Sequence, residues 1–149
     1  MEEEQMIKEL FIITNKLKRL LDKKHSKNGL YVGQARVLMY LYRHKDEKTY
    51  QKDIEQAFQI RGGTVTGLID SLVENQYIKR IESENDKRKR KIVLTNKGEQ
   101  MALKSIQTTK NTEESLSDQL LEKEKETLKK VIKKINTWVD KEEENEKNI

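Results

Sequence analysis

The chain has 149 residues, of which 38% are charged and 34% hydrophobic. This length is typical of one domain that buries a modest core, and part of the apolar surface is expected to be completed by a second copy of the chain. The sequence contains no cysteine, which excludes disulfides, thiolate metal sites and cysteine nucleophiles. No apolar run approaches the roughly 20 residues that span a bilayer, and the chain starts with acidic residues, so we expect a cytoplasmic protein without membrane association.

The net charge of +5 is small for a nucleic-acid-binding protein, so the distribution of charge matters more than its sum. Residues 77–91 contain seven basic and three acidic residues, which concentrates positive charge in one short stretch.

The first predicted helix ends near Asn28 and Gly29, a pair that often terminates helices. Its apolar residues recur at alternating spacings of four and three, the pattern of one helix face. So wide a face requires a large packing partner. The stripe consists of Met6, Leu10, Ile13, Leu17 and Leu20.

Two shorter helices are predicted next. The first begins near Gly33 and continues to the polar residues that start at Arg43. The second covers residues 50–58, with Thr49 as its N-cap. Its expected buried residues are Ile54, Ala57 and Phe58.

A fourth helix is predicted after Gly62-Gly63 and runs to about Asn75, with apolar residues at helical spacing. Small polar residues, including Thr64 and Thr66, fall on or near its opposite face. A short helix, a tight turn and a helix of this kind match the helix-turn-helix, whose second helix enters the major groove of DNA. Many other helical hairpins share this pattern. On its own it therefore does not distinguish a DNA-binding helix-turn-helix from a helical hairpin with only a structural role.

A basic hairpin is predicted to follow this helix. Residues 77–81 and 92–95 are β-prone and can pair, with residues 83–89 at the tip. A basic tip can bind a polyanion, because each cation set against a phosphate releases condensed counterions. The alternative is a solvated charged loop. The cations are Lys87, Arg88, Lys89, Arg90 and Lys91.

The last third is predicted to be helical, with one helix over residues 96–118 and a final helix with an apolar seam at coiled-coil-like spacing. The first and last helices either pair across a two-fold axis or pack within one subunit, and we favour the dimer. The expected dimerisation residues are Met6, Leu10, Ile13, Leu17, Leu128, Ile132, Ile135 and Trp138.

In the same order along nearly the whole chain, the sequence resembles the MarR family of bacterial transcription regulators. The family pattern has a TVT-type recognition helix, a G-L-I-x-R entry to the wing, a D-[RK]-R wing tip and an L-T-x-x-G exit. The matching segments are Gly63-Thr64-Val65-Thr66, Tyr77-Ile78-Lys79-Arg80, Asp86-Lys87-Arg88 and Leu94-Thr95-Asn96-Lys97-Gly98.

The resemblance implies a mainly α fold with a small β-hairpin, in which a winged helix-turn-helix domain carries N- and C-terminal dimerisation helices. Residues 1–149 are expected to form a single domain. Residues 33–95 would be the DNA-binding region, with the wing at about 78–95, and residues 1–29 and 96–149 would mainly serve dimerisation.

The resemblance also implies a homodimer that binds a pseudopalindromic site in double-stranded DNA. Arg88 would enter the minor groove, held by Asp86. Thr64 and Thr66, with Arg61 at the turn, would face the major groove, while Gln51 and Lys52 would contact phosphates. The full set of implied DNA-binding residues is Gln51, Lys52, Arg61, Gly63, Thr64, Thr66, Asp86, Lys87, Arg88, Lys89 and Arg90.

Gly67 departs from the family pattern, because a larger polar or basic residue is frequent at this point of the recognition helix. An interior glycine costs a helix roughly 1 kcal/mol relative to alanine. Either the backbone approaches DNA closely at Gly67, or few side chains contact the base edges and DNA shape carries more of the specificity.

The function implied is a sequence-specific transcriptional regulator, namely a repressor released by a small-molecule ligand. The alternative is a winged protein that binds nucleic acid without sequence preference or serves as a protein-interaction scaffold. An arginine beside aromatic residues suits a planar or anionic effector, although these side chains also fit a plain core or interface. The expected pocket residues are Phe11, Tyr31, Arg36, Met39 and Tyr40.

An enzymatic function is not expected. His25 and His44 are 19 residues apart, lack a triad or metal-ligand spacing, and are interpreted as solvated surface residues. Gly62-Gly63 lacks the rest of any phosphate-binding loop motif. We therefore expect no catalytic residue, metal or cofactor.

Overall fold

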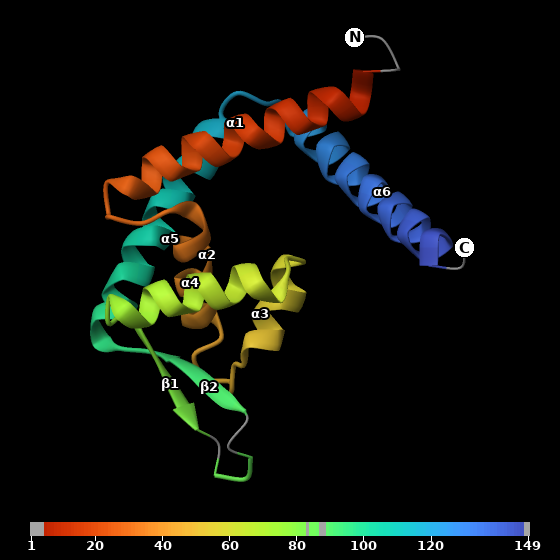
Figure 1. The fold of residues 1–149 in the computed structure, drawn as a ribbon. Helices are drawn as coiled ribbons and strands as arrows, with labels where there is room; N and C mark the ends of the chain where they lie inside the picture. The colour runs from red at the N-terminus through yellow and green to blue at the C-terminus, as the bar shows by residue number, and fades with distance from the viewer. Residues whose placement is uncertain (1–4, 83, 87–88, 148–149) are drawn as a thin grey trace. The chain divides into compact units, whose positions relative to one another are not determined.

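The computed structural model describes residues 5–82, 84–86, 89–147 of the chain. Within these ranges the chain forms six α-helices and one antiparallel pair of strands (Figure 1). This confirms the predicted mainly α fold with a small hairpin. The elements are α1 (Met6–Ser26), α2 (Val32–Arg43), α3 (Gln51–Phe58), α4 (Gly62–Glu74), β1 (Ile78–Glu82), β2 (Arg90–Leu94), α5 (Asn96–Ser117) and α6 (Glu122–Lys147).

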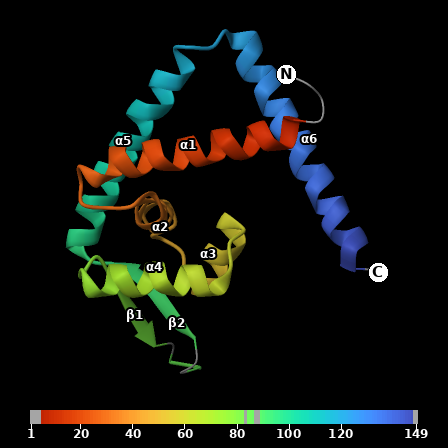
Figure 2. The ribbon, with the colours of Figure 1, turned by 45° about the horizontal axis from the view of Figure 1, so that its top comes forward.

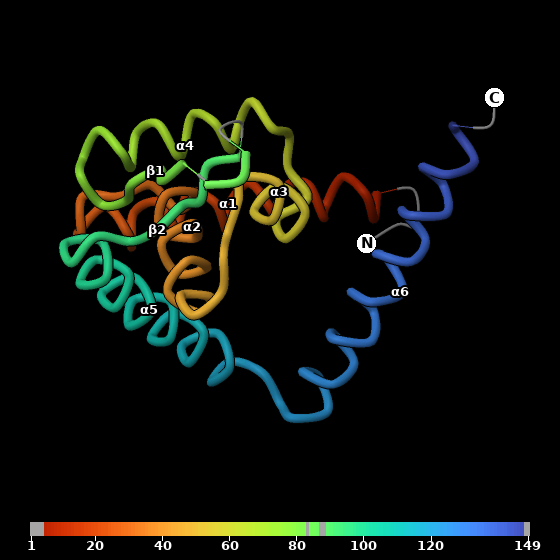
Figure 3. The backbone as a smooth tube through the Cα atoms, turned by 90° about the horizontal axis from the view of Figure 1, so that it is seen from below, coloured from red at the N-terminus to blue at the C-terminus, as the bar shows by residue number. Residues whose placement is uncertain are grey.

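The chain divides into two compact units after Thr109, within α5. In the first unit α2 is central and contacts α1, α4 and β2; Figure 2 looks nearly along its axis. Figure 3 shows α4 and the first turns of α5 on opposite sides of the two strands. The second unit contains α6. Among the described residues, no helix of either unit is long and apolar enough to cross a membrane.

The core of the first unit forms where the apolar faces of α2, α3 and α4 meet. Leu38 of α2, Ile54 of α3 and Ile69 of α4 are completely buried, as their helical spacing predicts. Ala57 was expected in this core, but it is exposed. The eight-residue helix α3 buries a narrow stripe that includes Ile54 and the partly buried Phe58, which leaves Ala57 on the solvent side.

The beginning of α3 also differs from the prediction. Tyr50, not Thr49, is the N-cap, and its N–H donates to the Asp53 carboxylate at 2.8 Å. Thr49 is buried, and its carbonyl accepts a hydrogen bond from the Ile92 N–H of β2 at 2.8 Å. Thr49 therefore attaches the hairpin to the loop before α3 instead of capping the helix.

The end of α1 confirms the predicted stop signal. Gly29 adopts a left-handed conformation with φ of 77°, and the Leu30 N–H donates to the His25 carbonyl at 3.2 Å. These are features of a Schellman helix ending. The prediction that His25 is a solvated surface residue is wrong, because its side chain is only 1% exposed. Burial lowers the pKa of His25, with Asp22 acting in the opposite direction.

The junction from α4 to β1 is a second Schellman ending. The Tyr77 N–H donates to the Leu72 carbonyl, and the Gln76 N–H donates to the Val73 carbonyl, both at 2.9 Å. Gln76 has a φ of 64°. This residue occupies the glycine position of the G-L-I-x-R pattern, so a side chain is held where glycine is favoured.

The Leu-Thr-x-x-Gly segment starts α5 against this junction. The Thr95 hydroxyl donates to the Gln76 carbonyl at 2.7 Å and accepts from the Gly98 N–H at 3.0 Å, which caps the first turn. A Cβ atom on Gly98 would lie 1.9 Å from the Tyr77 carbonyl oxygen. The glycine is therefore required, because α5 approaches the backbone of the α4–β1 junction too closely for any side chain.

Candidate nucleic-acid interface

Helices α3 and α4 form the predicted helix-turn-helix. Gln59 ends α3 in a left-handed conformation with φ of 53°, and Arg61 is the extended N-cap of α4. Val65, Ile69 and Leu72 anchor α4 in the core. The first turn of a helix leaves backbone N–H groups without intrahelical partners, and these groups together with the helix dipole favour phosphate.

The exposed face of α4 carries small side chains or none. Gly63, Thr66, Gly67 and Asp70 share this face, because they are spaced three, four and seven residues from Gly63. All four are exposed, and a Cβ atom added to Gly63 or Gly67 would meet no atom within 4 Å. Thr66 therefore stands between two positions without side chains, and Thr64 is exposed beside them.

Gln51 is brought against the recognition helix. Its side-chain Nε2 donates to Thr66 Oγ1 at 2.9 Å and lies 3.3 Å from the Gly62 carbonyl oxygen. The Thr66 hydroxyl in turn donates to the Gly62 carbonyl at 2.9 Å. Two predicted DNA-binding residues thus meet in the protein itself, while the neighbouring Lys52 is exposed.

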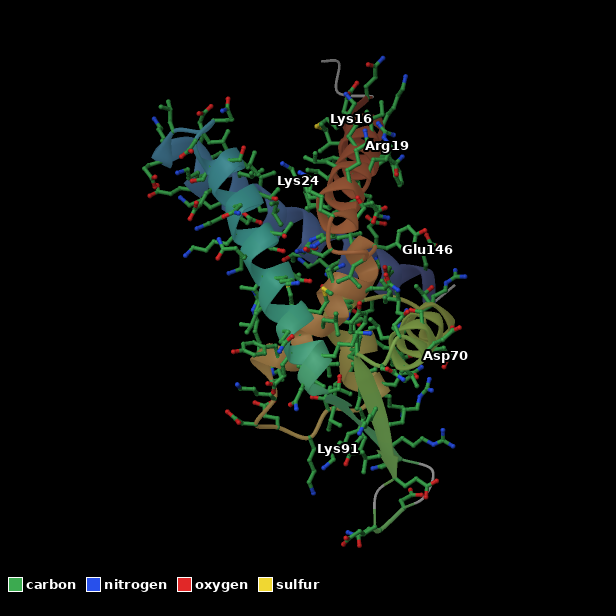
Figure 4. The ribbon with its side chains drawn as sticks, turned by 90° about the vertical axis from the view of Figure 1, so that its left-hand side faces the viewer. Lys16, Arg19, Lys24, Asp70, Lys91 and Glu146 are labelled. Atoms are coloured by element: carbon green, nitrogen blue, oxygen red, sulfur yellow. The ribbon has the colours of Figure 1, made fainter. Side chains whose placement is uncertain are left out.

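An ion pair that the sequence analysis missed links α4 to the hairpin. The Arg80 guanidinium on β1 contacts the Asp70 carboxylate on α4. Figure 4 shows Asp70 on the solvent side of α4, away from α5. The two residues are ten positions apart, in a helix and a strand, so neither helical nor strand periodicity predicts their contact.

The two strands form the predicted wing. Ile78 pairs with Leu94 and Glu82 with Arg90, and the buried Ile78 and Ile92 attach the hairpin to the core. Of the predicted DNA-binding residues, Lys89 and Arg90 are exposed.

Near the tip, Asp86 is partly buried, and its carbonyl accepts from the Lys89 N–H at 3.0 Å. Lys87 and Arg88 lie outside the described residues. The implied contact of Asp86 with Arg88 therefore stays a prediction.

The residues of the expected effector pocket are distributed over several places. The Arg36 guanidinium lies 4.4 Å from the centre of the Phe58 ring, and Tyr40 packs edge-on against the same ring. Phe58, which sequence reasoning assigned only to the core, thus joins two predicted pocket residues. Burial raises the pKa of Tyr40, and Asp53 and Glu47 act in the same direction.

The other three expected pocket residues differ in exposure. Met39 is buried and accepts a hydrogen bond from the Thr109 hydroxyl at 3.3 Å, whereas Phe11 and Tyr31 are 65% and 72% exposed. No group of three His, Cys, Asp or Glu side chains in the described ranges is placed to hold a metal ion.

The residues expected at a dimer interface carry apolar side chains that the single chain leaves uncovered. On α1 and α6 these side chains are mostly about half exposed, and Ile135 is partly buried. The exposed members are Met6, Leu10, Ile13, Leu17, Leu128, Ile132 and Trp138.

Comparison with known proteins places this geometry among DNA-binding regulators. Residues 28–89 match the sequence profile of the MarR family. The HTH-type transcriptional repressor YetL of Bacillus subtilis is 30% identical over 89 residues, which are 60% of this chain and 53% of YetL. The matched region thus spans about half the length of that curated relative.

Solved structures match over most of the chain. The DNA complex of S. aureus MepR is 27% identical, with a TM-score of 0.85, over 93% of this chain and 99% of MepR. The heme sensor PefR of Streptococcus agalactiae in complex with heme is 26% identical, with a TM-score of 0.66, over 91% of this chain and 92% of PefR.

Proposed function

The chain belongs to the MarR family, and on that premise we propose that it is a sequence-specific transcriptional regulator that binds double-stranded DNA. The observation that carries the proposal is the exposed face of α4, which bears small residues and is joined to a basic wing by the Asp70–Arg80 ion pair. Such a face can approach base edges in the major groove, while the wing reaches the neighbouring groove.

The residues have distinct roles in this proposal. Thr64 and Thr66 face base edges and Arg61 contacts DNA at the turn, whereas Lys52 and the exposed cations of the wing contact phosphates and set the position of the protein. Arg88, restrained by Asp86, inserts into the minor groove and reads its width and negative potential.

The regulator acts as a homodimer. Residues 33–95 bind one half of a pseudopalindromic operator, and residues 1–29 and 96–149 mainly provide the dimer contacts. The uncovered apolar faces of α1 and α6 support this arrangement, because each is wide enough to bury substantial area against a second copy. A protein with this function acts on the chromosome, in the cytoplasm.

Binding represses transcription, and a small effector releases the protein from DNA. The repressor YetL and the heme-bound sensor PefR support these two parts of the proposal among the relatives. The effector is planar or anionic and binds near Arg36 and Tyr40, where a cation and aromatic rings already meet. Phe11 and Tyr31, which are exposed in the single chain, and the buried Met39 are the other proposed effector contacts.

Selection of bound duplexes from a random-sequence pool tests the proposal. A pseudopalindromic consensus with two equivalent half-sites is expected. Arg88→Ala should weaken binding to the selected operator by roughly 1–3 kcal/mol without changing dimerisation. Lys104→Ala, which removes an exposed cation from α5, is the matched control and should bind as the wild type does. A pool that yields no consensus supports nonspecific nucleic-acid binding instead.

A further inference from the structure

The hydrogen bonds around Thr66 restrict what this residue can recognise in DNA. We infer that Gln51 is a positioning residue that turns Thr66 into a reader of the thymine methyl group, so that each half-site favours an A·T pair opposite Thr66. The inference rests on the proposed function, since it assigns one specificity determinant within the same DNA-binding site.

The Thr66 hydroxyl has no proton to offer a base. A hydroxyl group carries one proton and two lone pairs. The proton is donated to the Gly62 carbonyl at 2.9 Å, and one lone pair accepts from Gln51 Nε2 at 2.9 Å. Acceptors on a base edge, such as guanine O6 and N7, therefore gain no hydrogen bond from this hydroxyl.

Gln51 also fixes the orientation of the Thr66 side chain. Threonine in a helix divides between two χ1 rotamers, because its hydroxyl can bond to either of two preceding carbonyls. The bond from Gln51 selects the rotamer in which Oγ1 faces Gly62. The orientation of the Gln51 side-chain amide is also fixed. Its Nε2 lies 3.3 Å from the Gly62 carbonyl oxygen, and a carbonyl oxygen favours a hydrogen-bond donor at this distance.

What Thr66 offers to DNA is its methyl group and one remaining lone pair. Gly63 and Gly67 flank Thr66 on the exposed face, and neither carries a side chain that would hold the helix away from the bases. In the major groove the apolar group is the C5-methyl of thymine, and its partner adenine presents an N6 amino donor that suits a lone pair. An A·T pair satisfies both groups, whereas the G·C pair lacks the methyl.

Replacing thymidine by deoxyuridine tests the inference, because it removes only the C5-methyl. Each thymidine of the selected operator is replaced in turn. With the wild type, one position per half-site should lose about fourfold in affinity, the effect expected for one buried methyl group. Thr66→Ser keeps the hydroxyl and loses the methyl, so this penalty should disappear. Gln51→Ala should reduce the penalty, while Gln56→Ala, an exposed position on the same helix, should leave it unchanged.

The outcomes separate this inference from the proposed function. If the operator is bound specifically but every deoxyuridine penalty persists in Thr66→Ser, the methyl readout is wrong and the proposed function stands. If Gln51→Ala shows the same deoxyuridine penalty as the wild type, Gln51 does not position Thr66. Equal binding of operator and random duplexes by the wild type would overturn both. Circular dichroism and thermal unfolding of each variant ensure that a change in affinity does not come from misfolding.

Discussion

A substitution at Gly67 should affect the stability of the fold and the recognition of DNA in opposite directions. Its position is in the interior of α4, and a Cβ atom there would meet no atom within 4 Å. Alanine is favoured over glycine in a helix interior by about 1 kcal/mol. Gly67→Ala should therefore raise the free energy of unfolding by about 1 kcal/mol, which corresponds to roughly 2–4 °C in Tm for a chain of this length.

The same methyl group should weaken DNA binding. If the α4 backbone approaches the bases at Gly67, an added methyl overpacks the interface, and overpacking typically costs about 1–3 kcal/mol. Operator affinity should then fall by roughly 5- to 150-fold. The expected variant is thus more stable than the wild type and a poorer DNA binder.

Two measurements on the same samples decide the outcome. Unfolding is followed by denaturant titration at one fixed protein concentration, because the stability of a dimer depends on concentration. Operator binding is followed by fluorescence anisotropy. A fall in stability would refute the reasoning that Gly67 faces open space. A rise in stability with unchanged affinity would refute the close approach of the backbone to DNA.

Three other predictions concern residues that affect the stability of the fold. Gly98→Ala should destabilise the fold by about 3 kcal/mol, because its Cβ would lie 1.9 Å from the Tyr77 carbonyl oxygen; an unchanged denaturation midpoint would contradict this. Gln76→Gly should stabilise the fold by about 0.5–1 kcal/mol by relieving a φ of 64°, and a lower midpoint would show that the Gln76 side chain contributes more than its strain costs. Burial lowers the pKa of His25, against the effect of Asp22, so the unfolded chain takes up the proton first and stability should fall as the pH drops below about 6.5. His25→Gln should flatten this pH dependence of unfolding, and an equal slope in both proteins would exclude His25 as its source.

Periodic and local features were predictable from the sequence. The apolar spacing of α2 and α4 identifies core faces, because residues at helical intervals share one side of a helix. Gly29 marks a helix end, because glycine adopts a positive φ without strain. Thr95 and Gly98 mark the start of α5, because the Thr95 hydroxyl accepts a hydrogen bond from the Gly98 N–H and so caps the first turn.

Contacts between elements were not predictable from periodicity. His25 has polar neighbours in the sequence, yet its side chain is buried in the fold. The Asp70–Arg80 ion pair and the Gln51–Thr66 hydrogen bond join different elements, and no spacing rule relates their members. What covers the apolar faces of α1 and α6 stays a prediction, because periodicity identifies an apolar face without identifying the surface that packs against it.

The decisive measurement compares the affinity of the protein for the DNA upstream of its own gene with its affinity for shuffled DNA of equal length, at about 0.15 M salt. A regulator bound to an operator in that region should discriminate by about 10³ or more. Equal affinity for both duplexes, falling steeply with added salt, would identify phosphate contacts as the whole of the interaction and contradict sequence-specific recognition.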